Sequence, residues 1–459
     1  MTYCKLPFSA RSVLLSCQYL DNPILLYHGG SGTVDKRPTF ASLCFGPTAQ
    51  HVAYSAADVV LMHQQLSHTL TSSRDTLAVK SSLKSSPMHG HFRSGWAGFW
   101  GYDACQILAY SGAKSDVSSA ASSSDVPMAY FGYYPCILEL HEVTDEVWLH
   151  NPNALTEEER QPWITQLTEA LAQLATSNDS LRTEAELCRP SWQPLWQQHD
   201  YKQAFARVHE YLSAGDCYQV NLAMPFVHQG DLRARSPLPL LTSFDAPFSA
   251  YCRLPDLTLF SVSPERFIRI QDGQLQTKPI KGTSPRGSTP RQDDDNRQSL
   301  RNSTKNQAEN VMIVDLLRND LSRSATPHSV RVDELFAIES HANVHHMVST
   351  ISAQLADTQT PFHAITQALP GGSITGAPKR RAMEIIQELE CRPRGAYCGS
   401  LGYFDDGGQC DFNILIRTIS ATKDEAICWG GGGVVMDSTA DDEYQEIFNK
   451  VQRILDTAW

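Results

Sequence analysis

The order of strand and helix patterns along the chain predicts an α+β protein. Strand-like runs occur in groups, and runs with apolar residues at helical three-to-four spacing occur in separate groups. A doubly wound sheet would instead show strict alternation of one strand with one helix. At 459 residues, the length favours two or three domains or one large interwoven unit.

The first part of the chain contains three recognisable elements. Residues 94–104 alternate glycine with aromatic side chains, which is typical of a buried strand that its neighbours approach closely. Spaced apolar residues predict further strands within 135–150. A helix is expected after Thr156, because Thr156 and Glu159 match the capping-box pattern.

A polar segment with two prolines, 178–194, separates this part from the rest of the chain. We therefore expect an N-terminal region, 1–190, and a second domain, 196–456, with the boundary in this segment. We find no internal repeat that would divide the chain differently.

The second part has denser signals. Asp200 and Gln203 are expected to start a helix that Gly215 ends. Asp272-Gly273 lies between two strand-like runs and predicts a hairpin with a type I′ turn. Further strands are expected at 217–227, 249–253 and 257–262, and further helices at about 303–321, from Pro378 onward and at about 440–457.

Composition excludes several classes of protein. The chain is 41% hydrophobic and 19% charged, as soluble globular proteins are, and its net charge of -12 argues against nucleic-acid binding. Its 12 cysteines form no CxxC pair, so a zinc ribbon is unsupported and a reducing compartment is favoured. We see neither a signal peptide nor an apolar run of the ~20 residues that cross a bilayer. We expect a cytoplasmic protein with no membrane or nucleic-acid partner.

Residues 370–379 form a glycine-rich loop that leads into a helix. The free backbone N–H groups at such a helix start favour an anion. Gly371 and Gly376 have the spacing of a nucleotide-binding loop, but Ala377 and Pro378 stand where a Lys-Ser/Thr pair must follow. We therefore expect a carboxylate site, and a tight loop without a ligand is the alternative.

Three carboxyl groups stand out by position. Glu309 lies early in a predicted helix, and Glu443 and Glu446 lie three residues apart on the last one. Carboxylates from separate helices suit a hard cation such as Mg²⁺. The alternative is a solvated helix face on which Glu446 pairs with Lys450, four residues later.

Lys281 and Glu265 are candidates for catalysis. To act as a nucleophile, Lys281 must be neutral, and its pKa must fall well below the usual ~10.4 through burial or nearby positive charge. Glu265, upstream across the predicted hairpin, is a candidate general acid if it holds a proton. The ordinary alternatives are a solvated lysine at a strand end and a surface glutamate beside Arg266.

The order of several segments along the second part is the strongest signal. These segments are SVSPERF, TKPIKGTSPRG, AENVMIVDLLRNDLSR, HANVHHMVSTI, LPGGSITGAPKRRAMEIIQELE, YCGSLGYF, ILIRTI, GGGGVVMDS and DDEYQEIFNKVQRIL. Together they closely resemble the chorismate-binding enzymes, and within that family the aminodeoxychorismate synthases. The resemblance covers about 201–455, while 1–190 is more loosely similar to the N-terminal region found in this family.

The resemblance implies a fold and a set of site residues. The fold would be a sandwich of large antiparallel sheets with helices on the outside. Glu309 and Glu446 match direct Mg²⁺ ligands with Glu443 in support, so that the ion clamps the ring carboxylate of chorismate. Arg417 and Tyr397 match positions that hold the enolpyruvyl carboxylate, and His346 matches a histidine near the ring hydroxyl. The remaining positions of the substrate cradle are Ser373, Thr375, Gly376, Gly431, Gly432 and Gly433.

Two positions bear on the reaction that the resemblance implies. Gln219 stands where water-using relatives have a lysine base, which favours ammonia as the nucleophile. Lys281 matches the residue that distinguishes aminodeoxychorismate synthases, whereas anthranilate synthases have alanine. In the mechanism proposed for the family, the lysine attacks C2 of chorismate while the C4 hydroxyl leaves with help from Glu265, and ammonia then enters at C4. The alternatives are anthranilate synthase component I and a catalytically silent subunit.

The resemblance also implies a partner. The sequence shows no glutaminase domain, so we expect a separate glutamine amidotransferase subunit to supply ammonia. Some family members hold tryptophan in an N-terminal pocket. The corresponding segment, 24–29, departs from the inhibitor-binding pattern, which leaves tryptophan binding open.

Overall fold

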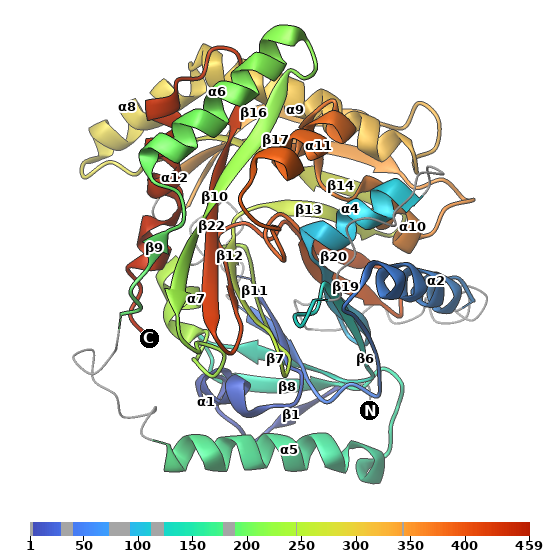
Figure 1. Ribbon diagram of the computed structural model, residues 1–459. Coiled ribbons are helices and arrows are strands. Elements are labelled where there is room, and N and C mark those ends of the chain that lie inside the picture. The colour runs from blue at the N-terminus through green and yellow to red at the C-terminus, as the bar shows by residue number, and fades with distance from the viewer. Residues whose placement is uncertain are drawn as a thin grey trace.

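Two antiparallel sheets form the framework of the molecule (Figure 1). The computed structural model describes residues 3–28, 40–72, 92–111, 124–177, 189–244, 246–341 and 344–459. In these ranges one sheet has 12 strands and the other has 10. The α+β sandwich implied by the resemblance is confirmed.

The 12-stranded sheet combines strands from both ends of the chain. In spatial order it contains β1 (Tyr3–Leu6), β8 (Glu146–His150), β7 (Ile137–His141), β3 (Phe40–Cys44), β2 (Ile24–His28), β11 (Phe248–Arg253), β12 (Thr258–Ser263), β21 (Thr418–Ala421), β22 (Glu425–Val434), β10 (Gln219–Gln229) and β18 (Gly376–Ala377), and β9 (Gln193–Pro194) also pairs with β10. The segment β22–β10–β18 carries glycines and polar residues of the candidate site.

The 10-stranded sheet is built in the same mixed way. Its order is β15 (Ile280–Pro285), β17 (Val344–Gln354), β14 (Gln274–Lys278), β13 (Arg266–Gln271), β20 (Cys410–Asn413), β19 (Ser400–Asp405), β5 (Gly95–Trp100), β6 (Ala129–Tyr134) and β4 (Ala49–Ala53), and β16 (Arg331–Ser340) also pairs with β17. Strands β15 and β17 bring two further candidate residues to the site.

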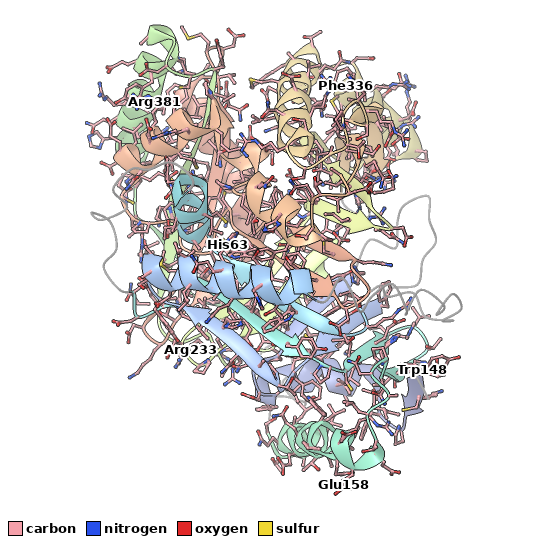
Figure 2. All side chains as sticks on the ribbon, turned by 90° about the vertical axis from the view of Figure 1, so that its right-hand side faces the viewer. His63, Trp148, Glu158, Arg233, Phe336 and Arg381 are labelled. Carbon is pink, nitrogen blue, oxygen red and sulfur yellow. The ribbon has the colours of Figure 1, made fainter. Side chains whose placement is uncertain are left out.

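Helices lie around the two sheets (Figure 1). They are α1 (Ala10–Ser16), α2 (Ala56–Ser72), α4 (Tyr102–Ser111), α5 (Glu157–Thr176), α6 (Gln198–Ala214), α7 (Leu238–Phe244), α8 (Pro290–Arg301), α9 (Thr304–Ser322), α10 (Pro361–Ala368), α11 (Lys379–Leu389) and α12 (Ala440–Leu455), with short 3₁₀ turns η1 (Cys17–Tyr19) and η5 (Gly372–Ile374). Figure 2 shows Glu158 on α5 at one end of the molecule, and Arg381 on α11 and Phe336 on β16 at the opposite end. No helix in the described ranges is both long and apolar enough to span a bilayer.

One continuous apolar core includes side chains from both sheets. Its centre is aromatic: the ring centroids of Trp100 and Phe131 lie 4.3 Å apart, and those of Phe404 and Phe412 lie 4.9 Å apart. Such rings bury large apolar areas and favour tilted contacts over flat stacks. This core fixes the frame to which the candidate site is attached.

Several local expectations are confirmed. Thr156 and Glu159 form both hydrogen bonds of a capping box at the start of α5. Asp272 and Gly273 have φ angles of 51° and 77° and connect β13 to β14, as a type I′ hairpin requires. Residues 95–100 form the fully buried strand β5.

The expected start of the helix at Asp200 is wrong. Helix α6 begins at Gln198, with Gln197 as its N-cap, and the Gln197 backbone N–H donates to Asp200 Oδ2 at 2.9 Å. Asp200 is therefore the third helical residue of a capping box and not its first residue. The end of α6 at Gly215 is confirmed, since Gly215 has a left-handed φ of 81°.

The two sequence units expected on either side of residues 178–194 share both sheets. Strand β2 pairs with β11, with Leu26 opposite Ala250, and β5 pairs with β19, with Gly98 opposite Gly402. Part of the expected boundary segment, 178–188, lies outside the described residues. The division into 1–190 and 196–456 stays a prediction about the sequence, and in space the N-terminal strands complete both sheets.

Candidate active site

The candidate residues come from strands of both sheets and from two helices. Gln219 lies on β10, His346 on β17, Lys281 on β15, and the glycine run on β22. Glu309 lies on α9, and Glu443 and Glu446 lie on α12. The other candidates occupy connections: Glu265 between β12 and β13, Ser373 and Thr375 before β18, Tyr397 before β19, and Arg417 before β21.

Glu265 is a buried carboxyl group, 6% exposed, at the end of β12. Its backbone is fixed because the Ile414 N–H donates to the Glu265 carbonyl at 3.1 Å. The Ser373 hydroxyl donates to Glu265 Oε1 at 2.9 Å. Burial raises the pKa of Glu265 to about 7, although Lys281 and Ser373 act in the opposite direction. A carboxyl group with a raised pKa can hold a proton at a pH where ordinary glutamates are ionised.

Lys281 is partly buried on β15, next to an irregularity in the strand. The pairing of β15 with β17 shifts register between Ile280 and Thr283, and Gly282 has a φ of 82°. A side chain at Gly282 would clash with Asn306 and Leu300, so glycine is required there. Such a bulge re-aims the neighbouring side chain.

The amine of Lys281 has a lowered pKa and no bonding partner in the part of the chain that the structure describes. Burial lowers its pKa below the ordinary value, while the carboxylates of Glu265 and Glu309 oppose this change. Among the described residues, Lys281 makes no hydrogen bond or ion pair. A lysine with a lowered pKa and no ion-pair partner is available as a nucleophile.

The loop 370–379, which we call the cradle loop, packs between β10 and α9. Gly376 pairs with Val220 of β10 and has a φ of 147°. A Cβ atom at Gly376 would lie 2.1 Å from the Gln219 carbonyl oxygen, so only glycine allows this approach. The Thr375 hydroxyl is fully buried and donates to the Gly371 carbonyl at 3.0 Å, which braces the loop.

The glycine run of β22 leaves room for two polar side chains. A Cβ atom at Gly432 would lie 2.7 Å from Glu443 Oε2, and one at Gly433 would lie 2.9 Å from Gln219 Nε2. The neighbouring Gly431 pairs with Ala223 of β10. Gln219 is 1% exposed, and its Nε2 has no hydrogen-bond partner in the described structure. Buried polar groups of this kind are usually satisfied, so an unpaired amide beside the glycine run is a candidate contact for a ligand.

Arg417 and His346 are close enough for the charge of Arg417 to affect the pKa of His346. Burial lowers the pKa of His346 to about 3, and the charge of Arg417 contributes to this effect. His346 Nδ1 and the Thr283 hydroxyl are 2.9 Å apart, so the neutral imidazole has a fixed orientation. Arg417 has a φ of 51°, a left-handed conformation that arginine rarely adopts and that is found preferentially at functional sites.

Tyr397 lies in the connection between α11 and β19 and packs against β22. Its ring stacks on Trp429, with centroids 5.7 Å apart and planes 7° from parallel, and it is 4% exposed. The stack holds the phenol rigidly, which suits a residue that orients a ligand.

The three candidate metal carboxylates do not form a ready-made cluster. In the described ranges, no group of three His, Cys, Asp or Glu side chains is arranged to hold a metal ion. Glu446 is half exposed and pairs with Lys450 at 2.6 Å, as the alternative derived from helical spacing predicts. Glu443 is buried and accepts from the Ser438 hydroxyl at 2.8 Å. Among the described residues, Glu309 makes no hydrogen bond or ion pair, but its charge acts on Lys281.

Sequence reasoning missed the position of Lys450 in this site. Lys450 Nζ donates to the Gly431 carbonyl at 2.9 Å as well as pairing with Glu446, and its charge acts on both Glu265 and Lys281. The four-residue spacing from Glu446 was visible in the sequence. What it did not show is that this helix face points toward the glycine run of β22.

Comparisons with known proteins identify the family of the chain. Residues 24–456 match the family model described as chorismate binding enzyme. The chain is 41% identical over 412 residues to aminodeoxychorismate synthase component 1 of Klebsiella aerogenes, covering 88% of this chain and 84% of that protein. It is 50% identical over 266 residues to the protein of the same name from Escherichia coli strain K12, covering 58% of each.

A solved structure supports the fold independently. Anthranilate synthase component I from Streptococcus pneumoniae superposes with a TM-score of 0.71 at 23% identity, over 91% of this chain and 92% of that one. The family model matches most of the chain, and the relative from Klebsiella aerogenes is similar over most of its length. The chain therefore belongs to the chorismate-binding enzyme family.

Proposed function

We propose that the chain aminates chorismate at C4 with ammonia and forms 4-amino-4-deoxychorismate, a step toward para-aminobenzoate and folate. The observation that carries the proposal is the pair formed by Lys281 and Glu265. A lysine with a lowered pKa lies within electrostatic reach of a buried carboxyl group whose pKa is raised to about 7. The relatives named aminodeoxychorismate synthase component 1 support the same substrate and product.

The binding groups have distinct tasks in this proposal. Arg417, with its planar fork of donors, binds the enolpyruvyl carboxylate together with the Tyr397 hydroxyl. Ser373, Gly376, Gly431 and Gly432 form the surface on which the ring rests, and Thr375 braces the loop beneath it. His346 is neutral because its pKa is low, so its free ring nitrogen can exchange a hydrogen bond with the C4 hydroxyl without adding charge.

The reaction requires two successive displacement steps on the ring of chorismate. The neutral amine of Lys281 forms a bond to C2, the two ring double bonds shift, and the C4–O bond breaks while Glu265 gives its proton to the departing oxygen. Ammonia then forms a bond to C4, the double bonds shift back, and the bond from C2 to Lys281 breaks. Glu265 accepts the proton that the new ammonium group loses. The net reaction exchanges the C4 hydroxyl for an amino group and releases one water.

The acidic residues fit Mg²⁺. Glu309, Glu443 and Glu446 supply carboxylate oxygens from two helices. Glycine at position 432 lets Glu443 Oε2 approach β22 closely, because a Cβ atom there would lie only 2.7 Å from this oxygen. Protein sites for Mg²⁺ commonly use one or two carboxylates and take the other ligands from substrate and water, so a cluster of three is not required. When bound, Mg²⁺ would supply positive charge for the ring carboxylate of chorismate.

The source of ammonia is proposed to be a glutamine amidotransferase subunit that forms a heterodimer with this chain in the cytoplasm. The name component 1 in the relatives supports a second component. Glutamine-dependent turnover by the purified chain with no other protein present would refute this part of the proposal, whereas activity with ammonium salt alone is expected.

Product identification tests the reaction. Purified chain is mixed with chorismate, Mg²⁺ and ammonium salt, without any lyase, and products are analysed by mass spectrometry and fluorescence. We expect a non-fluorescent product in which an amino group has replaced the hydroxyl and the pyruvyl group is retained. Fluorescent anthranilate would instead assign the chain to the alternative reaction, and unchanged chorismate would indicate a silent subunit.

A further inference from the structure

A buried ion pair, Glu390–Arg394, contacts the backbone of the cradle loop. Glu390 follows the end of α11, and the Arg394 guanidinium donates to both of its carboxylate oxygens, from Nε at 2.8 Å and from Nη2 at 2.6 Å. The two side chains are only 2% and 1% exposed. Burying such a pair costs desolvation energy that its attraction barely offsets, so stability alone does not explain it.

The same guanidinium binds the backbone of the cradle loop and of β10. Arg394 donates to the Ile374 carbonyl at 3.2 Å and to the Asn221 carbonyl at 2.7 Å. The Asn221 side chain also donates to the Ile374 carbonyl, at 2.8 Å. In addition, the Asn221 N–H donates to the Thr375 carbonyl at 2.8 Å. Arg394 thereby ties the loop that carries Ser373 and Thr375 to the strand that carries Gln219.

The pair reaches two more parts of the site. The Ala223 N–H of β10 donates to Glu390 Oε1 at 3.0 Å, and Ala223 is the strand partner of Gly431. The Arg394 guanidinium also lies over the Tyr397 ring, 5.5 Å from its centroid. One cation therefore contacts the cradle loop, β10 and the Tyr397 ring at once, although it touches neither Glu265 nor Lys281.

We propose that Arg394, oriented by Glu390, is a positioning residue for the substrate. It fixes the cradle loop and Tyr397 at the spacing that chorismate needs, and it acts through these groups without touching the substrate. This inference rests on the proposed function, because chorismate is the ligand whose placement it sets. Lysine cannot replace arginine here, since a single ammonium cannot satisfy a bidentate carboxylate and two carbonyls in one plane.

Arg394 borders a cavity that the cradle loop does not line. Together with Glu390, Arg392 and Trp429 it lines a cavity of about 840 Å³, and none of the described residues that line this cavity belongs to the cradle loop. A small guanidinium ion can therefore enter the space left by a truncated Arg394 without passing through the substrate site.

The test compares Arg394→Lys with Arg392→Lys. Arg392 lines the same cavity and pairs with Glu425 at 2.6 Å, and it has no contact with the cradle loop among the described residues. We expect Arg394→Lys to weaken chorismate binding by about tenfold and to lower kcat/KM for chorismate further, because small displacements of a bound substrate slow reactions strongly. KM for ammonium is expected to stay unchanged, as are all constants of Arg392→Lys.

Two further measurements separate positioning from loss of folding. Methylguanidinium is expected to restore part of the chorismate affinity of Arg394→Ala but to have no effect on the wild type. If the Arg394 variants do not fold, Glu390→Gln provides the test, with an expected weakening of chorismate binding of about threefold and unchanged KM for ammonium.

The inference would be overturned if Arg394→Lys bound chorismate as tightly as Arg392→Lys does. Where Glu390→Gln replaces Arg394→Lys in the test, the same comparison applies to it. A wild-type chain that binds chorismate but forms no aminated product would refute the proposed function while leaving the affinity test valid. A wild-type chain that does not bind chorismate would refute both.

Discussion

Replacing Lys281 by alanine is expected to abolish C4 amination, with a loss in kcat of about 10⁴-fold or more. Removal of a covalent nucleophile costs this much in enzymes because the remaining groups only bind and polarise the substrate. Chorismate affinity is expected to remain within about threefold of the wild type, since carboxylate binding is assigned to other residues. The measurements are steady-state kinetics with ammonium salt and equilibrium binding of chorismate.

Lys278→Ala is the matched control for this variant. Lys278 lies three residues earlier, on β14, and its amine is paired with Glu339 on β16. Its replacement likewise removes one lysine amine but is expected to leave kcat unchanged. Turnover of Lys281→Ala at the wild-type rate would remove Lys281 from the mechanism, and formation of anthranilate by this variant would show that Lys281 directs the regiochemistry.

Replacing Glu265 by glutamine is expected to slow formation of the first bond by about 10²- to 10⁴-fold, the usual effect of losing a general acid. The amide retains the shape of the carboxyl group and can still accept from Ser373, but it has no acidic proton to give to the departing hydroxyl. Glu334→Gln, on the exposed strand β16, is the control and is expected to react at the wild-type rate.

The difference in rate between the wild type and Glu265→Gln is expected to depend on pH. Burial raises the pKa of Glu265 to about 7, so the group is protonated and competent below that pH and becomes ionised above it. The ratio of the wild-type rate to the Glu265→Gln rate, measured in a single turnover without ammonia, is therefore expected to fall as pH rises through about 7. A ratio that stays constant from pH 6 to 8, or about one throughout, would contradict the role of general acid.

Local elements could be predicted from the sequence because their signals are local. The capping box at Thr156 and Glu159 and the hairpin turn at Asp272-Gly273 are each specified by a few adjacent residues. The start of α6 was misplaced because Gln197 is an uncommon N-cap, and Asp200, a common one, stands three residues later. A pattern based on the commonest capping residue therefore shifted the helix boundary.

Contacts within the site could be predicted less well, because they join segments far apart in the chain. The resemblance identified Glu265 and Lys281 but not the bond from Ser373 to Glu265, which spans 108 positions. Arg394 follows a short loop after α11, and its partner Asn221 lies 173 positions away. Neither residue type nor spacing indicates that such an arginine supports the substrate site.

The central claim is that Lys281 bonds covalently to the chorismate ring. Its most direct test is mass spectrometry of the wild-type chain mixed with chorismate and Mg²⁺ in the absence of ammonia, followed by quenching and digestion. We expect the peptide that contains Lys281 to gain the mass of chorismate less one water, and this adduct to disappear when ammonium salt is added before quenching. An unmodified Lys281 peptide in a preparation that turns over normally once ammonium is supplied would contradict the account.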